Sequence, residues 1–460
     1  MSKPKEYSWM TKDKLMTYTF FALLIITIVT AAIYSQETTP SKWNLGLTLA
    51  INALIAVGVA VGIDVFFNKI TVDSPLNIMS AAVYGLIVTD IYVLGVPSMT
   101  TPGFDLFPLE APQCFVFVAL ISLVGIVLFK KLMGLAGRKY VNPAAAAKLV
   151  VMIPFINTLL LAIDHLKSGL LKVPSLAGPL SSTSVINGNG GGTGYPGFGS
   201  YMFSCFYNSS LKTPTPTMNG LLQLMLLDKF HGWPGGASSI AVLVVGIGFF
   251  VVARRYVKWR ITLSYFVTVA VLSLIFSAAL GDQNYLVRFL FLMFIGSSIF
   301  LGFFMATDPA TTPLTYTGQL LFGVGTAVLT VLMITYLQFF GASFVALIIM
   351  NLTVPALDKI GRMKPTTESK EPKLPKAQAF APEKIKEYQC MRCGACMRVC
   401  CHKLSPIMIK QAFDKMNFDQ MSKLHADYCT GCGHCTYVCP SRIDLRKAVL
   451  QSKGMLRQQE

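Results

Sequence analysis

The chain has 460 residues and a formal net charge of +17, yet only 13% of its residues are charged and its mean hydropathy is +0.57. Such a composition excludes an ordinary soluble protein, in which about a quarter of the residues are charged. Nucleic-acid binding is also unsupported, because the basic residues have no stacking-aromatic or groove-reading context. Nineteen of the 39 Lys and Arg residues lie after residue 357, where anionic lipid on a cytoplasmic membrane face would attract them.

Repeated apolar runs predict an all-α polytopic membrane protein. A run of about 20 apolar residues crosses a bilayer as a helix, and a helix satisfies its own backbone groups in lipid. The first run has no convincing small-residue cleavage site between Thr30 and Gln36, so we expect a membrane helix and not a cleaved signal peptide. The ten predicted spans are 17–35, 44–67, 77–96, 113–130, 142–163, 237–253, 261–280, 287–306, 319–338 and 341–357.

The distribution of Lys and Arg predicts the orientation of these spans. Positive residues precede the first span and follow the fourth and sixth, whereas the short loops of opposite parity are nearly free of them. Positive loops face the cytoplasm, so ten spans place both termini in the cytoplasm and the protein in the inner membrane. We therefore expect a cytoplasmic segment at 1–16, a membrane domain at 17–357 and a large external loop at about 164–236.

The large loop is rich in Gly and polar residues. Residues 182–200 contain a Gly-Gly-Gly run, and the polar stretch at 208–217 ends in alternating Thr and Pro from Thr213 to Thr217. The G-x-G-x-x-G pattern of a dinucleotide site does not occur there, and Gly-Gly-Gly is weak as a phosphate cradle. By itself, this composition favours a flexible extracellular linker.

Three ionisable residues lie within the apolar runs. A charge in a bilayer is energetically expensive, which makes each of them a functional candidate. Asp90 is the deepest, and it is either part of an ion path or a structural partner. Asp64 and Lys148 lie nearer to helix ends, where they can pair or extend toward the interface.

The amino-acid composition of the chain changes after the last span. Residues 358–388 are rich in Pro, Lys and Glu and predict an extended, mobile linker. Residues 389–460 are long enough for a small bacterial-ferredoxin-like domain with two metal clusters. Ligation should supply much of the folding energy of so small a domain.

Two cysteine runs, from Cys390 to Cys400 and from Cys429 to Cys439, carry the strongest chemical signal. Both have the spacing C-x2-C-x2-C-x3-C, which holds [4Fe–4S] clusters in two-cluster ferredoxins and in which the fourth cysteine ligates the other cluster. Zinc is the main alternative, but structural zinc pairs usually lack the third and fourth cysteines. Cys401 takes the place of the usual proline, so we expect it to be a bystander. The predicted ligand sets are Cys390, Cys393, Cys396 and Cys439 for one cluster and Cys429, Cys432, Cys435 and Cys400 for the other.

Several short motifs resemble one family of membrane proteins. They are GLAGRKYVNPAA at 134–145, GWPGGASS at 232–239, RYVKWRI at 255–261 and FMATDPATTPLT at 304–315. Their order is similar to that in the RnfD protein of the Rnf complex and in the NqrB protein of the sodium-pumping NADH:quinone oxidoreductase. The cysteine domain instead resembles the C-terminal region of the RnfC protein. RnfD proteins normally lack such a tail, so the chain looks like a fusion of two electron-carrying parts.

The resemblance implies a flavoprotein. In this family FMN is joined through phosphate to a threonine of an S-x-A-T-type motif in the outer loop, and a second, noncovalent flavin (riboflavin is the candidate) lies nearer the cytoplasm. The matching threonine is Thr215, although the Ser and Ala of the motif are absent; Thr213 or Thr217 are alternatives. The motif residues Asn142 and Asp308 are assigned to the flavin neighbourhood.

These features predict an oxidoreductase subunit of a redox-driven Na⁺ or H⁺ pump, in which electrons pass between iron–sulfur clusters and flavins. Its expected partners are the other proteins of an Rnf-like complex and a ferredoxin or NADH-linked donor. One alternative is a membrane quinol oxidoreductase of the NapH/NosR kind that does not pump ions. Another is a transporter with a redox-sensing tail, which would contain no flavin.

Overall fold

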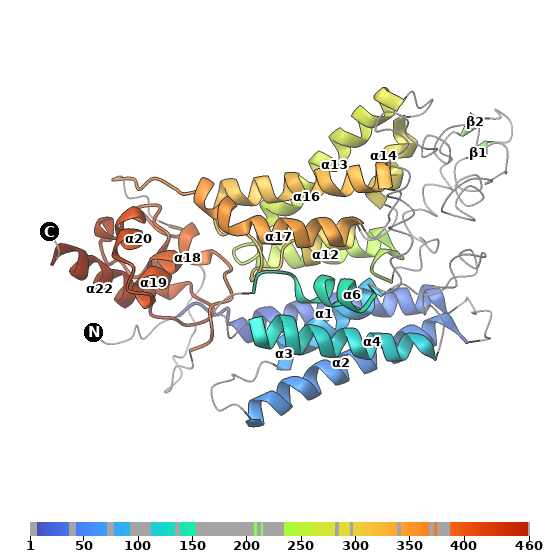
Figure 1. Cartoon of the computed structure of the whole chain (residues 1–460), viewed down its shortest axis with the longest axis horizontal. Coiled ribbons are helices and arrows are strands. Elements are labelled where there is room, and N and C mark those ends of the chain that lie inside the picture. Colours follow the sequence, from blue (N-terminus) through green and yellow to red (C-terminus); the bar gives the residue numbers. More distant parts are fainter. Residues whose placement is uncertain are drawn as a thin grey trace.

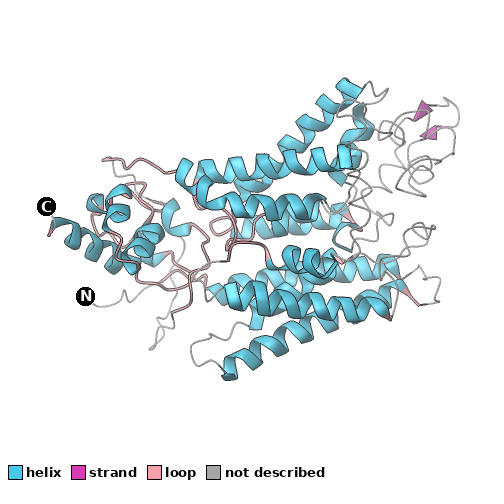
Figure 2. Cartoon of the chain, viewed as in Figure 1, coloured by secondary structure: helices cyan, strands magenta, loops and turns pink. Residues whose placement is uncertain are grey.

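The computed structural model of the chain is almost entirely helical (Figure 2). Among the described residues, the strands are one antiparallel pair, β1 (Tyr207–Asn208) and β2 (Thr213–Pro214), with Tyr207 opposite Pro214. The predicted all-α fold is therefore confirmed. The structure describes residues 7–35, 43–70, 78–92, 112–133, 139–152, 207–208, 213–214, 234–280, 285–294, 298–337, 342–367, 372–374 and 387–458.

Six helices of the described part are long and apolar enough to cross a membrane. At 1.5 Å per residue, a helix of about 20 residues spans the ~30 Å hydrocarbon core. Large apolar side chains such as Leu54 and Val251 point outward, as expected for surfaces that face lipid. The six are α1 (Lys12–Tyr34), α2 (Leu45–Ile70), α4 (Gln113–Val124) with its continuation η2 (Gly125–Leu132), α13 (Trp259–Leu280), α16 (Tyr316–Leu337) and α17 (Ala342–Ile360).

Shorter helices occupy the remaining predicted spans. The span predicted at 142–163 is described only as far as Met152, and the span at 287–306 is described as three pieces. That all ten runs cross the membrane therefore stays a prediction. These helices are α3 (Ile78–Ile91), α6 (Pro143–Met152), α12 (Ser239–Ala253), α14 (Tyr285–Phe294), α15 (Ser298–Phe300) and the π-helix η5 (Leu301–Met305), and η4 (Pro234–Gly236) precedes α12.

The helices pack in two groups (Figure 1). In one group α2 lies against α3 and α4, and α4 contacts α6; in the other α13 contacts α14 and α16, and α16 contacts α17. Glycines permit the closest approaches: a Cβ on Gly85 would lie 2.7 Å from the Cα of Val57, and one on Gly323 would lie 2.5 Å from the carbonyl oxygen of Ile261. Contacts of α1 with α12 and of α6 with α17 join the two groups.

The cysteine domain lies at one end of this bundle, at the left in Figure 1. Each of its two halves has a one-turn helix followed by a longer helix. The two halves also repeat in the sequence, since each cysteine of the second run lies 39 residues after its counterpart in the first. The helices are α18 (Ala395–Arg398), α19 (Pro406–Asp414), α20 (Phe418–Lys423), η6 (Ala426–Tyr428), α21 (His434–Tyr437) and α22 (Leu445–Arg457).

The start of the predicted linker is not extended. Helix α17 continues to Ile360, and the side chain of Asp358 is buried. Farther along, the backbone N–H of Thr366 donates to the carbonyl oxygen of His402 (3.2 Å). The predicted start of the linker at residue 358 is wrong, because α17 extends to Ile360 and Asp358 forms tertiary hydrogen bonds that composition does not reveal; the mobility of the linker stays a prediction.

The N-terminal segment lies against the cysteine domain. The N–H of Ser8 donates to the carbonyl oxygen of Tyr437 (2.9 Å), and the N–H of Lys12 donates to that of Pro440 (3.1 Å). Helix α1 therefore begins at the domain that ends the chain. The described residues nearest to the two ends of the sequence lie on the same side of the bundle.

Candidate functional site

The two cysteine loops share one backbone shape. Arg392 and Gly394 in the first loop and Gly431 and Gly433 in the second have φ between 57° and 81°. These left-handed residues wind each loop tightly, so that backbone N–H groups turn toward the enclosed sulfurs. One such contact is present, because the N–H of Arg392 lies 3.3 Å from the Sγ of Cys390.

The first group of thiols, which we call the membrane-side set, contains Cys390, Cys393, Cys396 and Cys439. Burial raises the pKa of Cys439 to about 12 and that of Cys393 to about 11, and in each case other thiols of the set add to the rise. Such thiols lose their protons when a metal takes the proton's place. The thiols of Cys390, Cys393 and Cys439 all act electrostatically on Cys396, so the four lie near one another, as a ligand set for an iron–sulfur cubane requires.

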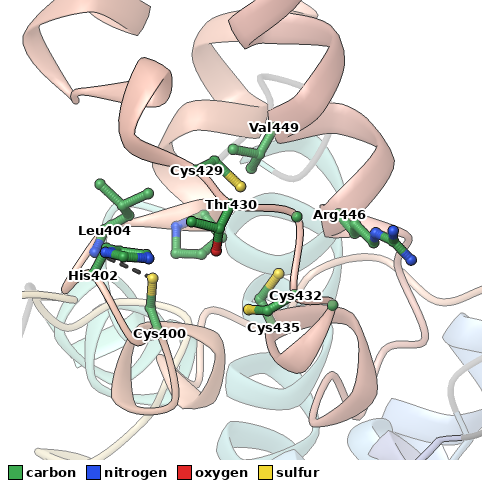
Figure 3. A pocket seen from close by; sticks show the side chains of 12 residues that line it. Cys400, His402, Leu404, Cys429, Thr430, Cys432, Cys435, Arg446 and Val449 are labelled. Carbon is green, nitrogen blue, oxygen red and sulfur yellow. Dashed lines mark hydrogen bonds between the residues drawn. The ribbon is translucent and has the colours of Figure 1, made fainter. Parts of the chain in front are cut away.

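The second group, the solvent-side set, contains Cys400, Cys429, Cys432 and Cys435. These side chains line a small pocket beside α22 (Figure 3). The N–H of Leu404 lies 3.3 Å from the Sγ of Cys400. Cys432 is exposed, whereas three of the four membrane-side thiols are buried. A cluster in this cavity would be accessible from solvent.

Cys401 lies next to the solvent-side set. Its Sγ lies 4.0 Å from the Sγ of Cys432 and 3.4 Å from the Nδ1 of His434. Sequence spacing gave no sign of this, because neither Cys401 nor His434 occupies a ligand position of the two runs. The fold brings them together by packing the end of the first run against the start of α21.

A shared apolar core connects the membrane-side set to the helix bundle. Tyr256 and Val257, in the turn after α12, are buried in it, and so is the ligand candidate Cys393. On another side, Leu314 packs against Cys396. The buried members of the first core are Met10, Leu15, Ala253, Tyr256, Val257, Met391, Cys393, Ala395, Val399 and Val438.

Arg398 is the main polar connection across this interface. Its guanidinium donates to the carbonyl oxygens of Arg254 (3.0 Å), Arg255 (2.6 Å) and Val257 (3.0 Å). These carbonyls lie just beyond the last turn of α12, where no N–H group of the helix is available to donate to them. A cation at a helix C-terminus is also electrostatically favourable. Arg398 lies two residues after Cys396, so the contact holds the cysteine loop against the bundle.

Two buried polar groups complete the interface. The carboxylate of Asp358 accepts from the N–H of Leu314 (2.7 Å) and pairs with Arg392 (3.2 Å). The ammonium of Lys258 donates to the carbonyl oxygens of Pro309 and Thr312, both at 3.0 Å, and to the hydroxyl of Thr312 at 2.8 Å. The loop at 309–315 therefore lies between the membrane-side set and the helices.

Asn142 and Asp308 have matching local roles. The side chain of Asn142 accepts from the N–H of Ala144 (3.1 Å) at the start of α6, and that of Asp308 accepts from the N–H of Ala310 (3.1 Å). Lys139, three residues before Asn142, interacts electrostatically with Asp308, so the two motifs are neighbours at one end of the bundle. Asn142 thus caps the start of α6 and Asp308 stabilises the turn that follows it, and a flavin role for them stays a prediction.

Asp90 is fully buried at the end of α3. Its Oδ1 accepts from the hydroxyl of Thr27 (3.0 Å) on α1, and its Oδ2 has no hydrogen-bond partner in the described structure. Beside it, the ammonium of Lys148 donates to the carbonyl oxygen of Ile91. Asp64, by contrast, forms an ion pair with Lys131 (2.7 Å), as its predicted pairing role requires. Asp90 is thus less satisfied than Asp64.

The flavin-site prediction falls on a part of the loop outside the described residues. Thr215 follows β2 directly, but neither it nor Thr217 is described. The element that follows begins at η4, where the carbonyl oxygen of Pro234 accepts from the hydroxyl of Thr30 (2.8 Å). The covalent link at Thr215 therefore stays a prediction.

Comparison with known proteins agrees with both halves of this architecture. A family model described as "NQR2, RnfD, RnfE family" matches residues 2–366. The chain belongs to this family. A second model, described as a 4Fe-4S dicluster domain, matches residues 370–443 and so covers the cysteine runs. The resemblance predicted from the short motifs is confirmed, and so is an iron–sulfur domain at the C-terminal end.

Individual relatives carry related names. The chain is 26% identical to the D component of the ion-translocating oxidoreductase complex of Halorhodospira halophila, over 52% of this chain and 65% of that protein. It is 24% identical to the D component of the Na(+)-translocating ferredoxin:NAD(+) oxidoreductase complex of Acetobacterium woodii, over 55% and 66%. It is 30% identical to the B component of the Na(+)-translocating NADH-quinone reductase of Chromohalobacter salexigens, over 33% and 39%. Each match spans less than two thirds of the relative's own length.

The Arg398 contact generates a testable prediction. Replacing Arg398 with alanine removes three charge-assisted hydrogen bonds, and a single bond of this kind contributes about 1.5–3 kcal/mol. We expect faster hydrogen exchange of the backbone at 254–258 and 391–399 in the detergent-purified protein. The control is Arg457→Ala, an exposed position near the end of α22, which should leave both segments unchanged. Equal exchange in wild type and Arg398→Ala would show that the domain docks without this contact.

Proposed function

We propose that this chain is the membrane subunit of a redox-driven, ion-translocating electron transport complex of the Rnf type. It would pass electrons between two cytoplasmic [4Fe–4S] clusters and flavins of the membrane domain. One observation carries the proposal: one cysteine set is accessible from solvent, whereas the other is packed against the loops of the helix bundle. The names of the relatives support the same conclusion.

The eight cysteines have distinct proposed roles. Cys390, Cys393, Cys396 and Cys439 are the proposed ligands of the membrane-side cluster, and Cys429, Cys432, Cys435 and Cys400 are those of the solvent-side cluster. When bound, each cluster supplies one-electron chemistry. The exposure of Cys432 lets a soluble donor approach closely. Tyr256 and Val257 exclude water from the membrane-side set, and Arg398 fixes its position on the bundle.

The membrane domain would hold the flavins. Thr215 is the proposed attachment point of FMN, because it occupies the sequence position of the threonine in the family motif and belongs to the loop predicted to be external. The neighbouring motifs of Asn142 and Asp308, at the end that carries the cysteine domain, are the proposed surroundings of a second flavin, with riboflavin as the candidate. A bound flavin would exchange electrons singly or in pairs.

The proposed setting is a multi-pass protein of the cytoplasmic membrane with both termini in the cytoplasm. In support, the N-terminal segment, the cysteine domain and the basic turn at 254–258 lie at the same end of the bundle. The proposed partners are the other proteins of the complex and a ferredoxin or an NADH-linked donor.

Asp90 is the proposed point on an ion path. Its carboxylate lies inside the bundle with one oxygen unpaired in the described structure, whereas most buried carboxylates are fully hydrogen-bonded. Such an oxygen is a suitable ligand for Na⁺ or a suitable site for a proton.

The first test concerns the clusters. We expect the purified full-length protein to contain eight irons and eight inorganic sulfides, as two complete cysteine sets require. Replacing Cys439 with serine should perturb the cluster of Cys390, Cys393 and Cys396 and leave that of its sequence neighbours intact, as seen by EPR of the reduced protein. Cys401→Ser is the matched control and should retain both signals. Stoichiometric zinc without a reducible signal would contradict the proposal.

The flavin attachment is tested by fluorescence after denaturing electrophoresis. Protein made in a host with a flavin transferase should give a fluorescent band, because a phosphoester link survives denaturation. The band should disappear in Thr215→Ala and persist in Thr213→Ala and Thr217→Ala. Fluorescence that survives Thr215→Ala would assign the link to a neighbour, and no fluorescence in any variant would exclude a covalent flavin.

The ion path is tested with the assembled complex in proteoliposomes. Asp90→Asn keeps the shape and the bond from Thr27 but removes the charge, so we expect ion uptake per electron to fall at least about tenfold. Asp90→Glu should retain part of it. The EPR signals of both clusters should be unchanged in either variant, because Asp90 lies away from the cysteine domain. Normal ion uptake by Asp90→Asn would leave Asp90 with a structural role only.

A further inference from the structure

Lys258 is a buried cation at the junction of the membrane bundle and the membrane-side cysteine set. Lys258 is fully buried, although it lies in the short connection between α12 and α13. Its neighbour Val257 belongs to the same apolar core as Cys393. Its acceptor Thr312 lies two residues before Leu314, which packs against Cys396. The ammonium group is therefore enclosed by elements that contact two of the four thiols.

The hydrogen bonds identify its charge state. Nζ lies within 2.8–3.0 Å of three acceptor oxygens, two on Thr312 and one on Pro309. Only a protonated amine has three N–H donors, whereas a neutral amine has two. Burial and the charge of Arg392 lower the pKa of Lys258 to about 7, whereas Asp358, Asp308 and the thiol of Cys393 act in the opposite direction. The negative charge of a bound cluster would strengthen that opposing effect.

No carboxylate neutralises this ammonium in the described structure. Asp358 instead pairs with Arg392, and the carboxylate of Asp308 accepts from Ala310 and from the hydroxyl of Thr311 (3.3 Å). Arg398, the third cation nearby, donates to the neutral carbonyl oxygens beyond α12, and its charge also acts on the thiol of Cys393. Lys258 contributes a positive charge whose acceptors are all neutral oxygens, so its field extends to the thiols of Cys390 and Cys393.

This field has a specific consequence for electron transfer. Reduction adds a negative charge to a cluster, and a buried, poorly solvated site opposes that charge. The membrane-side set is more buried than the solvent-side set, so burial alone would leave electrons on the solvent-side cluster. A buried cation acts strongly in a low dielectric and offsets this effect. The cations beside Cys429, which are Arg446 and Lys453, are exposed or partly exposed, and water and salt screen them.

We propose that Lys258, a residue of the membrane domain, raises the reduction potential of the cluster held by the membrane-side set and thereby draws electrons toward the membrane. The inference rests on the proposed function in one respect, that the two cysteine sets hold clusters. In the step concerned, one electron leaves the reduced solvent-side cluster, which is oxidised, and reduces the membrane-side cluster. Lys258 would not touch the cluster. It would act on the cluster only through the electric field of its ammonium charge.

The experiment is an EPR-monitored redox titration of the purified full-length protein. The signal of the membrane-side cluster is assigned first as the one that Cys439→Ser perturbs. In Lys258→Met we expect its midpoint to become more negative. A tenfold shift in the electron-sharing equilibrium toward the solvent-side cluster corresponds to about 59 mV for a one-electron couple. Lys258→Arg keeps the charge and should keep the midpoint near the wild-type value.

Two further variants make the result specific. Lys453→Met removes a cation beside Cys429, to whose carbonyl oxygen Lys453 donates (2.9 Å), and should move only the midpoint of the solvent-side cluster. Thr312→Asp places a carboxylate where a hydroxyl now accepts from Lys258. It should lower the membrane-side midpoint with Lys258 still present. This variant decides the question if Lys258→Met does not accumulate.

Each outcome has one meaning. A more negative membrane-side midpoint in Lys258→Met or Thr312→Asp, with Lys258→Arg unchanged, supports the inference. Two intact clusters with the wild-type midpoint in both charge-altering variants would overturn it and leave the proposed function standing. An equal shift in Lys258→Met and Lys258→Arg would also overturn it, because a packing change would then be the cause. A wild-type protein without reducible clusters would end the proposed function and this inference together.

Discussion

Arg398 satisfies carbonyl oxygens that the end of a helix cannot satisfy by itself. The turn directly after α12, at 254–257, presents backbone acceptors without helical partners, and a planar guanidinium with five N–H donors can serve several of them at once. The arginine lies in the one-turn helix that carries Cys396, so the same contact that completes α12 also positions the cysteine loop. Without it, the cysteine domain would depend for its orientation on an apolar patch, on the Arg392–Asp358 ion pair and on the N-terminal segment. An electron carrier with a variable orientation would have a variable distance to the membrane domain.

The buried charges of this protein are stabilised to different degrees. Asp64 has an ion-pair partner in Lys131 at 2.7 Å. Lys258 has three neutral oxygens, which satisfy its hydrogen bonds but leave its charge uncompensated. Asp90 has one hydroxyl donor and, within the described structure, one unpaired oxygen. A buried charge that is incompletely satisfied costs free energy, so residues of this kind are retained where the charge itself is useful. By this criterion Asp90 and Lys258 are functional candidates, whereas Asp64 is adequately explained by its ion pair.

Much of the candidate site is predictable from spacing. The interval of two residues between cysteines, with glycine between or after them, is sufficient to predict two tight loops, and the structure has them with Gly394 and Gly433 in the left-handed region. Other members of the site are not predictable in this way. His434 and Cys401 are 33 residues apart in sequence and meet only because the two halves of the domain fold against one another. The linker prediction failed at Asp358 for a related reason, since its partners Leu314 and Arg392 lie 44 and 34 residues away.

The sequence by itself determined the class of the protein and the chemistry of its C-terminal domain. Apolar runs long enough to cross a bilayer and thiols at fixed short intervals are local properties, which depend on neighbouring residues alone. Only the tertiary structure decided which cysteine set faces the bundle and which faces solvent, because the two runs have the same spacing. It also decided that Lys258, which in the sequence is one of several basic residues after a span, is enclosed beside the cysteines. Burial and proximity arise from contacts between distant segments, and no local pattern of residues encodes them.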